Sequence, residues 1–279
     1  MQEHLIHSNY DKTTVIEVTP ESAKWQYLSF SVINLKAGET YVHDTTGNES
    51  ALVPLVGSGT FAVGDQQFEI SRKGVFEELP HILYAPPNTS VTITAVSDFE
   101  FAFGSAPAEG KYPLRLFSPD EMKCEVRGGG AAQRQVNHVL AYPLPAERLI
   151  LFEVYVPGGT WSGWPPHCHD GHGDSAYLEE TYYFRIQPDY GFGFHRNYRI
   201  DQDFDEVFTF KHTDLVLVTQ GFHSTAAAPG SNVYFLNYLA GELLDDERGK
   251  PPYDDPAFGW MRNDWTGGQL TLPIVGDTE

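Results

Sequence analysis

The sequence predicts an all-β fold. Short runs of alternating apolar and polar residues, rich in β-branched and aromatic types, recur along the chain and are typical of strands. Gly, Pro, Asn and Asp separate these runs and mark turns. Amphipathic segments of helical length are scarce, so a β-sandwich or β-barrel is expected. The clearest predicted strands are residues 28–35, 60–63, 91–96, 149–156 and 233–238.

The composition fits one large folded domain or two of ordinary size. The chain has 279 residues, of which 41% are hydrophobic and 14% aromatic, so it can bury a sizeable core. Its net charge is −20, from 18 basic and 38 acidic residues, which opposes binding to nucleic acid or to anionic membranes. An anionic substrate would need a local group of arginines to overcome this charge.

The sequence predicts a cytoplasmic protein. No apolar stretch approaches the length needed to span a bilayer. The first residues lack the basic and apolar regions of a secretory signal. The two cysteines, Cys124 and Cys168, are far apart in sequence and make no disulfide framework.

Three histidines and one glutamate predict a transition-metal site. His167 and His169 are two residues apart, so in a strand both rings point to the same face. Glu180 opens a β-branched, aromatic run, and His223 follows a strand that ends in a turn at Gly221. Three nitrogens and one oxygen suit Zn, Mn, Fe or Ni better than Ca²⁺ or Mg²⁺. The alternative is a surface strand with two solvated imidazoles, because a chain with 11 histidines produces His-x-His by chance.

The two halves of the chain resemble each other in outline, which predicts an ancient duplication. The first half comprises residues 1–110, a connector follows at 111–146, and the second half comprises 147–279. In the first half, Asp44, Thr45, Thr46 and Asn88 occupy the positions where histidines would be expected. The second half alone is therefore predicted to bind metal.

The histidines and the glutamate resemble the metal-binding pattern of the cupin superfamily. More narrowly, the chain resembles the 5-deoxy-glucuronate isomerase family over nearly its whole length. This resemblance implies two cupin domains of jelly-roll (double-stranded β-helix) architecture, of which the N-terminal one lacks metal ligands. The segments that carry it are residues 161–170, 177–186, 221–223 and 234–241, with 86–89 and 105–108 in the first half.

The resemblance implies an aldose–ketose isomerase of bacterial inositol catabolism. Its substrate would be a small sugar acid, 5-deoxy-glucuronate, and its product 5-dehydro-2-deoxy-gluconate. The difficult step removes a proton beside an aldehyde, and a divalent transition metal (Zn, Mn, Fe or Ni) would stabilise the resulting enediolate. Cys168, Thr219 and His195 depart from the residues usual in the family, and His195 leaves the exact sugar open.

Tyr182, His195 and Arg196 are the predicted catalytic residues. Tyr182 shares a strand face with Glu180, so its hydroxyl can reach the substrate, although it could also be a space-filling residue of the barrel. A sugar carboxylate needs a cation, preferably arginine. Arg196 is favoured for this role because Arg185 has the opposite strand parity to Glu180. The arginines considered are Arg134, Arg185, Arg196 and Arg199.

Two other classes of function fit the same residues. A cupin with three histidines and a glutamate can support Fe(II) oxygen chemistry, which oxygen uptake would reveal. A sugar-binding module would bind its ligand without converting it. Within the isomerase class, a related uronate is a further alternative substrate. A homo-oligomer is compatible with the exposed sheet edges expected of such a fold.

Overall fold

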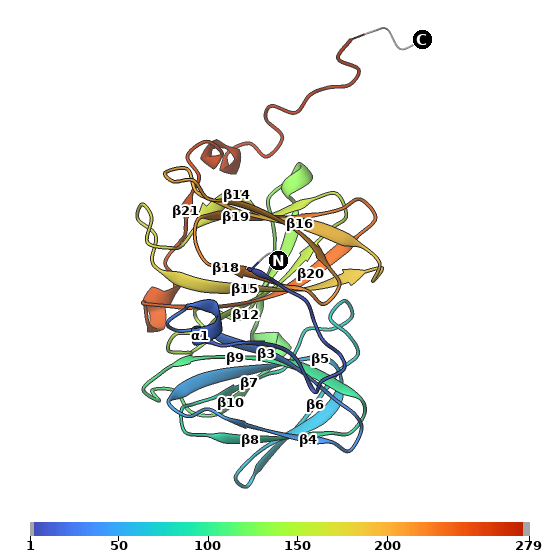
Figure 1. Cartoon of the computed structure of the whole chain (residues 1–279), viewed down its shortest axis with the longest axis vertical. Coiled ribbons are helices and arrows are strands. Elements are labelled where there is room, and N and C mark those ends of the chain that lie inside the picture. The colour runs from blue at the N-terminus through green and yellow to red at the C-terminus, as the bar shows by residue number, and fades with distance from the viewer. Residues whose placement is uncertain (1–2, 276–279) are drawn as a thin grey trace.

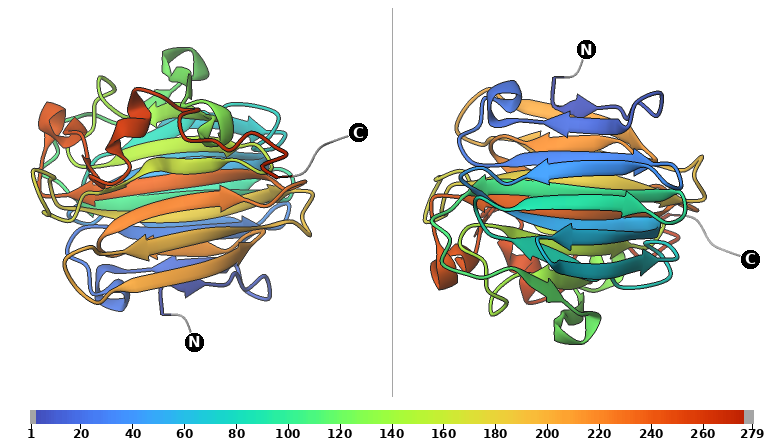
Figure 2. Two further views of the ribbon diagram at one scale, coloured as in Figure 1. Left: turned by 90° about the horizontal axis from the view of Figure 1, so that it is seen from above. Right: turned by 90° about the horizontal axis from the view of Figure 1, so that it is seen from below.

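The computed structural model describes residues 3–275, which form two β-barrels stacked on one another (Figure 1). The prediction of an all-β fold is confirmed, because strands dominate and α1 (Pro20–Ala23) is the one α-helix among these residues. Every pairing between the named strands is antiparallel, and Figure 2 shows their stacked layers from two directions. None of the helices within residues 3–275 is long and apolar enough to cross a membrane.

The first barrel is a nine-stranded sheet that curls on itself. Its main path runs in the order β10–β7–β5–β9–β3–β2, and β4, β6 and β8 join it through β5. The strands are β2 (Thr14–Val18), β3 (Ser29–Leu35), β4 (Thr40–Asp44), β5 (Asn48–Val63), β6 (Gln66–Arg72), β7 (Ile82–Ala85), β8 (Ser90–Ala95), β9 (Phe99–Pro107) and β10 (Arg115–Phe117).

Strand β5 closes this barrel because it pairs with strands on both of its sides. The first part of β5 pairs with β7 and β9, whereas the part from Gly57 onward pairs with β6 and β8. Gly57 has a φ of +98°, and a Cβ there would lie 2.0 Å from the carbonyl oxygen of Asp98. Only glycine fits this bend, because it tolerates positive φ and has no side chain.

The second barrel consists of a seven-stranded and a five-stranded sheet. The larger has the order β1–β18–β15–β20–β13–β12–β11 and the smaller β17–β16–β19–β14–β21. The strands of the larger sheet are β1 (Leu5–Ile6), β11 (Lys123–Arg127), β12 (Arg134–Leu140), β13 (Ile150–Val156), β15 (Leu178–Gln187), β18 (Leu215–Val218) and β20 (Asn232–Gly241). Those of the smaller are β14 (Trp161–Cys168), β16 (Phe192–Tyr198), β17 (Asp205–Lys211), β19 (Phe222–Ala227) and β21 (Tyr253–Asp254). Four short 3-10 helices connect them: η1 (Pro119–Glu121), η2 (Gly130–Ala132), η3 (Asp245–Gly249) and η4 (Gly259–Arg262).

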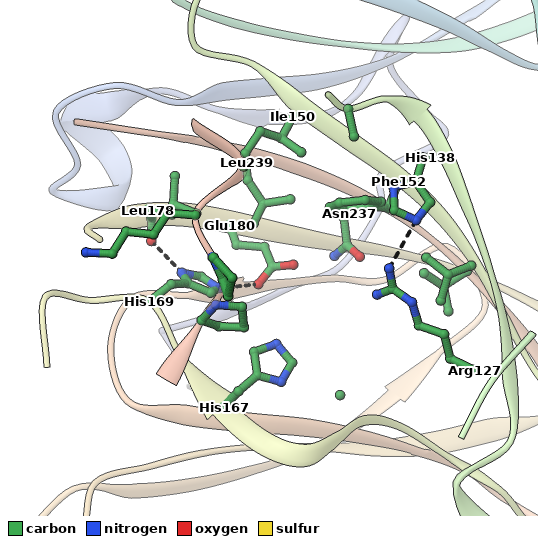
Figure 3. Close-up of a pocket in the computed structure, with 18 of the residues that line it drawn as sticks. Arg127, His138, Ile150, Phe152, His167, His169, Leu178, Glu180, Asn237 and Leu239 are labelled. Carbon is green, nitrogen blue, oxygen red and sulfur yellow. Dashed lines mark hydrogen bonds and ion pairs between the residues drawn. The ribbon is translucent and has the colours of Figure 1, made fainter. Parts of the chain in front are cut away.

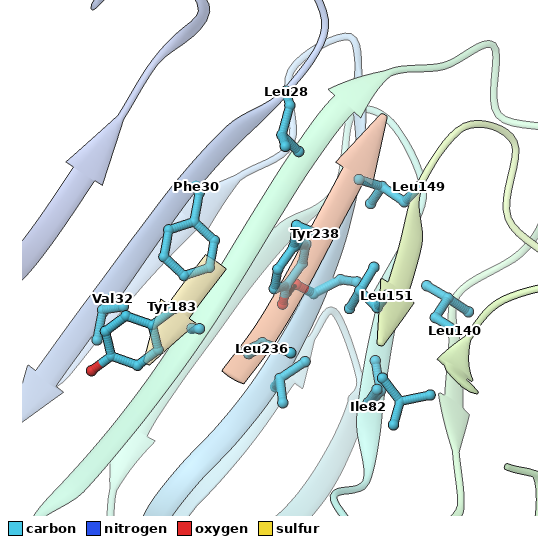
Figure 4. Close-up of a cluster of buried hydrophobic side chains, with 14 of the residues drawn as sticks. Leu28, Phe30, Val32, Ile82, Leu140, Leu149, Leu151, Tyr183, Leu236 and Tyr238 are labelled. Carbon is cyan, nitrogen blue, oxygen red and sulfur yellow. Dashed lines mark hydrogen bonds between the residues drawn. The ribbon is translucent and has the colours of Figure 1, made fainter. Parts of the chain in front are cut away.

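The largest hydrophobic core lies between the two barrels (Figure 4). The ring of Phe30 in β3 lies 5.9 Å from that of Tyr183 in β15 and 5.3 Å from that of Tyr238 in β20. Gly104 in β9 lets the sheets approach closely, because a Cβ there would lie 2.3 Å from the ring of Tyr238. The Tyr238 hydroxyl donates to the carbonyl oxygen of Ala51 at 3.0 Å, so even this buried polar atom is satisfied.

A buried ion pair also joins the barrels. Arg72 in β6 and Glu153 in β13 have fully buried side chains, and their two contacts of 2.7 and 3.0 Å form a bidentate pair. The Tyr234 hydroxyl donates to the same carboxylate at 2.7 Å. Each charge therefore has its partner within the protein, which is the condition for burying it.

Two glutamates join the barrels through equivalent sets of hydrogen bonds. Glu49 of the first barrel accepts hydrogen bonds from three consecutive backbone N–H groups, those of residues 147–149 just before β13. Glu179 of the second barrel accepts from the N–H groups of residues 26–28 just before β3. The two contacts are related as expected for a duplicated fold.

The division into residues 1–110, 111–146 and 147–279 stays a prediction, and the strand pairing crosses it in two places. Strand β1, near the N-terminus, pairs with β18 of the second barrel. The segment predicted as a connector contains β11 and β12, which extend the seven-stranded sheet beyond β13, and β10, which pairs with β7. Residues 1, 2 and 276–279 of these ranges lie outside the described residues.

Candidate metal centre

Strands β14, β15 and β19 bring the four predicted ligands together inside the second barrel. His167 in β14 pairs with His223 in β19, and Glu180 lies in β15 on the facing sheet. Strand β14 ends at Cys168, so His169 lies just beyond the strand. In Figure 3 the side chains of His169 and Glu180 meet, while His167 lies nearby. Cys168 is buried against Tyr198 and Phe222.

The orientation of His169 favours ligation through Nε2. Its Nδ1 lies 3.0 Å from the carbonyl oxygen of Leu178, and its Nε2 lies 2.9 Å from Oε2 of Glu180. When Nδ1 donates a proton to the carbonyl, the lone pair of Nε2 faces the Glu180 carboxylate. Two electron-rich groups in this position require a proton or a cation between them.

The ligand atoms of His169, Glu180 and His223 form a compact cluster. One donor atom from each lies within 4.8 Å of the others, and all three side chains are buried. The His167 ring centroid lies 4.6 Å from that of His223 and 6.3 Å from that of His169. His167 therefore borders the same space as the other three.

One imidazole of this cluster is buried without a hydrogen-bond partner. His223 is fully buried, yet neither of its ring nitrogens makes a hydrogen bond with the protein. Its Nε2 lies 3.2 Å from Oε2 of Glu180, in an orientation that does not form a hydrogen bond. Buried polar atoms in proteins are almost always satisfied. A metal ion between Nε2 of His223 and Oε2 of Glu180 would bind both of these atoms.

The electrostatics of Glu180 and His167 favour the protonation states that bind metals. Burial raises the pKa of Glu180, but the hydrogen bond from His169 and the charges of His223 and His169 outweigh it, so that the pKa lies well below its usual range. Burial, and then the charges of His223 and His169, lower the pKa of His167 far below its ordinary value. An ionised carboxylate and a neutral imidazole are the forms that ligate.

A cavity of about 830 Å³ opens beside the cluster. His167, His169 and Glu180 lie in its wall, next to apolar side chains that Figure 3 labels: Ile150, Phe152, Leu178 and Leu239. The cavity has ample room for a ligand the size of a sugar acid. The rest of the wall mixes apolar side chains with polar and charged ones, among them Arg127, Arg134 and Asn237.

Tyr182 lies in the wall of this cavity, on the same face of β15 as Glu180. It is 4% exposed, and its ring lies 5.8 Å from that of His223. Burial, followed by the negative charge of Glu180, raises the pKa of Tyr182 well above its ordinary value. Its hydroxyl therefore stays protonated at neutral pH.

His195 lies inside the barrel but does not line the cavity. Its Nδ1 is 2.7 Å from the Thr225 hydroxyl, and its Nε2 is 2.9 Å from Oδ1 of Asn197. Burial, and then the charge of His223, lower its pKa to about 3, so the ring is neutral. With both nitrogens engaged and its ring stacked beside His223, His195 is placed to hold that candidate ligand in position.

The structure does not bring Arg196 to the cavity. His195 and Asn197 face the barrel interior, so strand alternation points Arg196 outward. Its side chain is 46% exposed and pairs with Asp205 on the neighbouring strand. A catalytic role for Arg196 is therefore not supported by its position.

Asn237 and His138 line the cavity although no pattern in the sequence singled them out. Asn237 is 3% exposed and lies in the middle of β20, whose other central residues are apolar. A buried amide within an apolar strand is a signal that sequence reasoning could have used. His138 lies in β12, within the segment predicted as a connector, and its Nε2 is 2.9 Å from Oε1 of Glu125.

The model of the KduI/IolB family matches residues 4–261. The chain belongs to the KduI/IolB family. Among the relatives of this KduI/IolB protein is the 5-deoxy-glucuronate isomerase of Geobacillus thermodenitrificans (strain NG80-2), which is 40% identical over 260 residues, 91% of this chain and 93% of the relative. The protein of that name from Bacillus subtilis (strain 168) is 34% identical over 253 residues, 88% of this chain and 92% of the relative.

Solved structures agree with this assignment to the KduI/IolB family. An IolB-like protein from Salmonella typhimurium LT2 superposes with a TM-score of 0.87 and 35% identity, covering 92% of this chain and 98% of that one. A Bacillus subtilis oxalate decarboxylase, a cupin, gives a TM-score of 0.59 at 14% identity, covering 84% of this chain and 75% of that one. The second likeness concerns the fold alone. The prediction of two cupin domains in one chain is confirmed.

Proposed function

We propose that this chain is a metal-dependent aldose–ketose isomerase that converts 5-deoxy-glucuronate to 5-dehydro-2-deoxy-gluconate in inositol catabolism. The observation that carries the proposal is the His169–Glu180–His223 cluster, which meets a cavity of about 830 Å³. The chain that holds this cluster is 34–40% identical to proteins named 5-deoxy-glucuronate isomerase. A cytoplasmic location and a homo-oligomeric state stay predictions.

His167, His169, Glu180 and His223 would hold one divalent transition metal. Zn, Mn, Fe and Ni all accept three imidazoles and a carboxylate. When bound, such an ion supplies Lewis-acid stabilisation of the negative charge that develops on the substrate oxygens. Glu180 would be the one anionic ligand of the four. A divalent ion held by these residues would therefore keep a net positive charge, which attracts the negatively charged enediolate.

The surrounding residues would exclude water and orient the substrate. Ile150, Leu178 and Leu239 provide an apolar wall beside the ligands (Figure 3). Beside an apolar wall, hydrogen bonds to the reacting oxygens are stronger than in bulk water. Tyr182 keeps its proton at neutral pH and can donate such a bond, whereas it cannot act as the base.

The reaction itself moves two hydrogens within the substrate. A proton leaves C2 of the aldose and a proton is delivered to C1, while the hydroxyl on C2 gives up its proton and the oxygen on C1 gains one, so that the aldehyde becomes an alcohol and C2 becomes a ketone. The product has the same atoms as the substrate, and no oxidant or reductant is consumed. Isomerisation is therefore distinguishable from oxygenase chemistry by stoichiometry alone.

A proton NMR time course with 5-deoxy-glucuronate tests this function. Metal-analysed wild-type protein should remove the aldehyde signal and produce the ketone without consuming oxygen. The His169→Ala variant should lose both bound metal and activity, while His43→Ala in the first barrel serves as the matched histidine control. No conversion by metal-loaded protein would overturn the proposal. Conversion of another uronate would identify a related substrate, and oxygen uptake would identify the dioxygenase alternative.

A further inference from the structure

Arg134 differs from the other arginines considered for the substrate carboxylate. Within residues 3–275 it has no ion-pair partner, and it lines the cavity beside the candidate metal centre. An arginine already paired with a carboxylate is less available to a ligand, since a second anion must compete. The others are all paired: Arg185 with Glu100, Arg196 with Asp205, and Arg199 with Asp170 and Asp201.

The burial of Arg134 makes its missing counter-charge unusual. The residue is 9% exposed, and the hydrogen bond that its guanidinium donates to the described protein is from Nη1 to the Ala132 carbonyl oxygen, at 3.0 Å. A guanidinium carries five N–H donors, so most of them remain available to a ligand. Gly128 makes room for the group, because a Cβ there would lie 2.8 Å from Nη1. Such a buried cation is costly unless an anion joins it.

The strand register places Arg134 across the cavity from the metal centre. Arg134, Val136 and His138 alternate along β12 and all line the cavity. Strands β13 and β20 separate β12 from β15, which carries Glu180, so these two strands lie about 14 Å apart along the sheet. Figure 3 shows His138 on one side of the cavity and His169 on the other.

We propose that Arg134 binds the carboxylate of the substrate while the aldehyde end of the substrate lies at the metal centre. This inference rests on the proposed function. The two ends of the cavity match the two ends of 5-deoxy-glucuronate, whose aldehyde and carboxylate are the terminal carbons of a six-carbon chain. Arginine is suited to the role because its planar fork binds both carboxylate oxygens at once. Arg134 would therefore select uronates over neutral aldoses.

Other charges around the cavity support the binding of an anion. Arg127 and Arg262 also line it, each paired with its own carboxylate, Glu125 and Asp254. Burial, and then the positive charges of Arg127 and Arg262, lower the pKa of Arg134 to about 10, so it stays charged at neutral pH. The unpaired charge of Arg134 therefore provides a local attraction for an anionic sugar within a chain whose net charge is −20.

The test compares ligands with and without a carboxylate on metal-loaded full-length protein. The dissociation constants of D-glucuronate and D-glucose are measured by calorimetry for the wild type, Arg134→Gln, Arg134→Lys and Arg196→Gln. Arg134→Gln should weaken D-glucuronate binding by about 10- to 100-fold and leave D-glucose binding unchanged. Arg134→Lys should recover part of the loss, because it keeps the charge without the fork. Arg196→Gln should keep the wild-type preference.

Either an unchanged preference in Arg134→Gln or a lost preference in Arg196→Gln would overturn the inference. If Arg134→Gln does not fold by circular dichroism, the partial loss in Arg134→Lys decides the matter. Turnover separates this inference from the proposed function. Binding of uronates through Arg134 without isomerisation would refute the function alone. Isomerisation with an unchanged KM for 5-deoxy-glucuronate in Arg134→Gln would refute the role of Arg134 alone.

Discussion

The two barrels share one framework but place different side chains at equivalent positions. Glu49 and Glu179 mark the equivalence, because each accepts three consecutive N–H groups from the other barrel. The residue that follows is Ser50 in the first barrel and Glu180 in the second. One strand position thus carries a hydroxyl in one barrel and the carboxylate of the candidate metal centre in the other.

The histidine positions differ in the same way. His167 pairs with His223 across β14 and β19, whereas His43 pairs with Val91 across β4 and β8. By this register Thr45 takes the position of His169, as the sequence predicts for the segment 44–46. Val91 takes the position of His223. The former histidine position predicted from the sequence, Asn88, lies three residues before Val91. A turn that resembles another in sequence does not fix strand register.

The comparison shows how a functional site can be recognised from unsatisfied polar atoms. In the first barrel, His43 Nε2 lies 2.9 Å from the Ser50 hydroxyl, and the Phe103 ring covers His43 at 4.0 Å between centroids. In the second barrel, neither nitrogen of His223 has a hydrogen-bond partner. The same scaffold is therefore self-contained in one copy and incomplete without a ligand in the other.

Removing one histidine from each barrel in turn should give the largest difference between the two barrels. His169→Ala should lower kcat/KM by more than about 100-fold, the upper end of what outer-shell partners of a metal contribute. Bound metal, measured by elemental analysis, should fall in parallel. His43→Ala should retain both metal and activity, because Ser50 and Val91 offer no second strong ligand. Equal losses in the two variants would show that the first barrel also contributes to the site.

Breaking the ion pair between the barrels should have the largest effect on stability. Arg72→Met leaves the Glu153 carboxylate buried without its counter-charge and should lower the free energy of unfolding by about 3–5 kcal/mol. Denaturant titration should show one transition at a lower midpoint, since the shared core couples the barrels. The double variant Arg72→Met/Glu153→Met should recover much of the loss. Two separate transitions in the wild type would instead show that the barrels unfold independently.

The matching glutamates allow a direct test of equivalence. Glu49→Gln and Glu179→Gln each remove a charge that accepts three N–H groups, and each should cost about 2 kcal/mol of unfolding free energy. The measurement is denaturant unfolding of both variants under one condition. Similar losses would support the duplicated arrangement. A loss confined to one variant would mean that one of the two contacts carries the interface.

The sequence predicted the fold class and the grouping of the candidate ligands because both depend on local patterns. Alternation along a strand relates Glu180 to Tyr182, and the family-like segments contain the histidines. Arg196 lies on the outer face of β16, because neighbouring residues of a strand alternate and His195 faces inward; the sequence alone did not say which of the two does so. The inward face of β16 is defined only by the closed barrel, which buries His195.

Arg134 shows the other limit of sequence reasoning. Its place in the cavity depends on β12 joining the seven-stranded sheet, whereas the sequence marks that region by glycines and predicts a connector. Its lack of an ion pair depends on contacts between residues far apart in the chain. Long-range pairing of this kind leaves no local periodic signal.

The pH dependence of stability gives the smallest and most specific comparison. Burial, opposed by the charge of Asp44, lowers the pKa of His43 to about 4 from an ordinary value of 6.5. Between these two pH values the unfolded chain takes up a proton that the folded protein excludes, so stability is lost as the pH falls from about 6.5 toward 4. His43 should account for about 2 kcal/mol of the stability lost between pH 8 and pH 5. Unfolding titrations of wild type and His43→Gln at both pH values should differ by this amount, and equal slopes would show that His43 is accessible to protons in the folded protein.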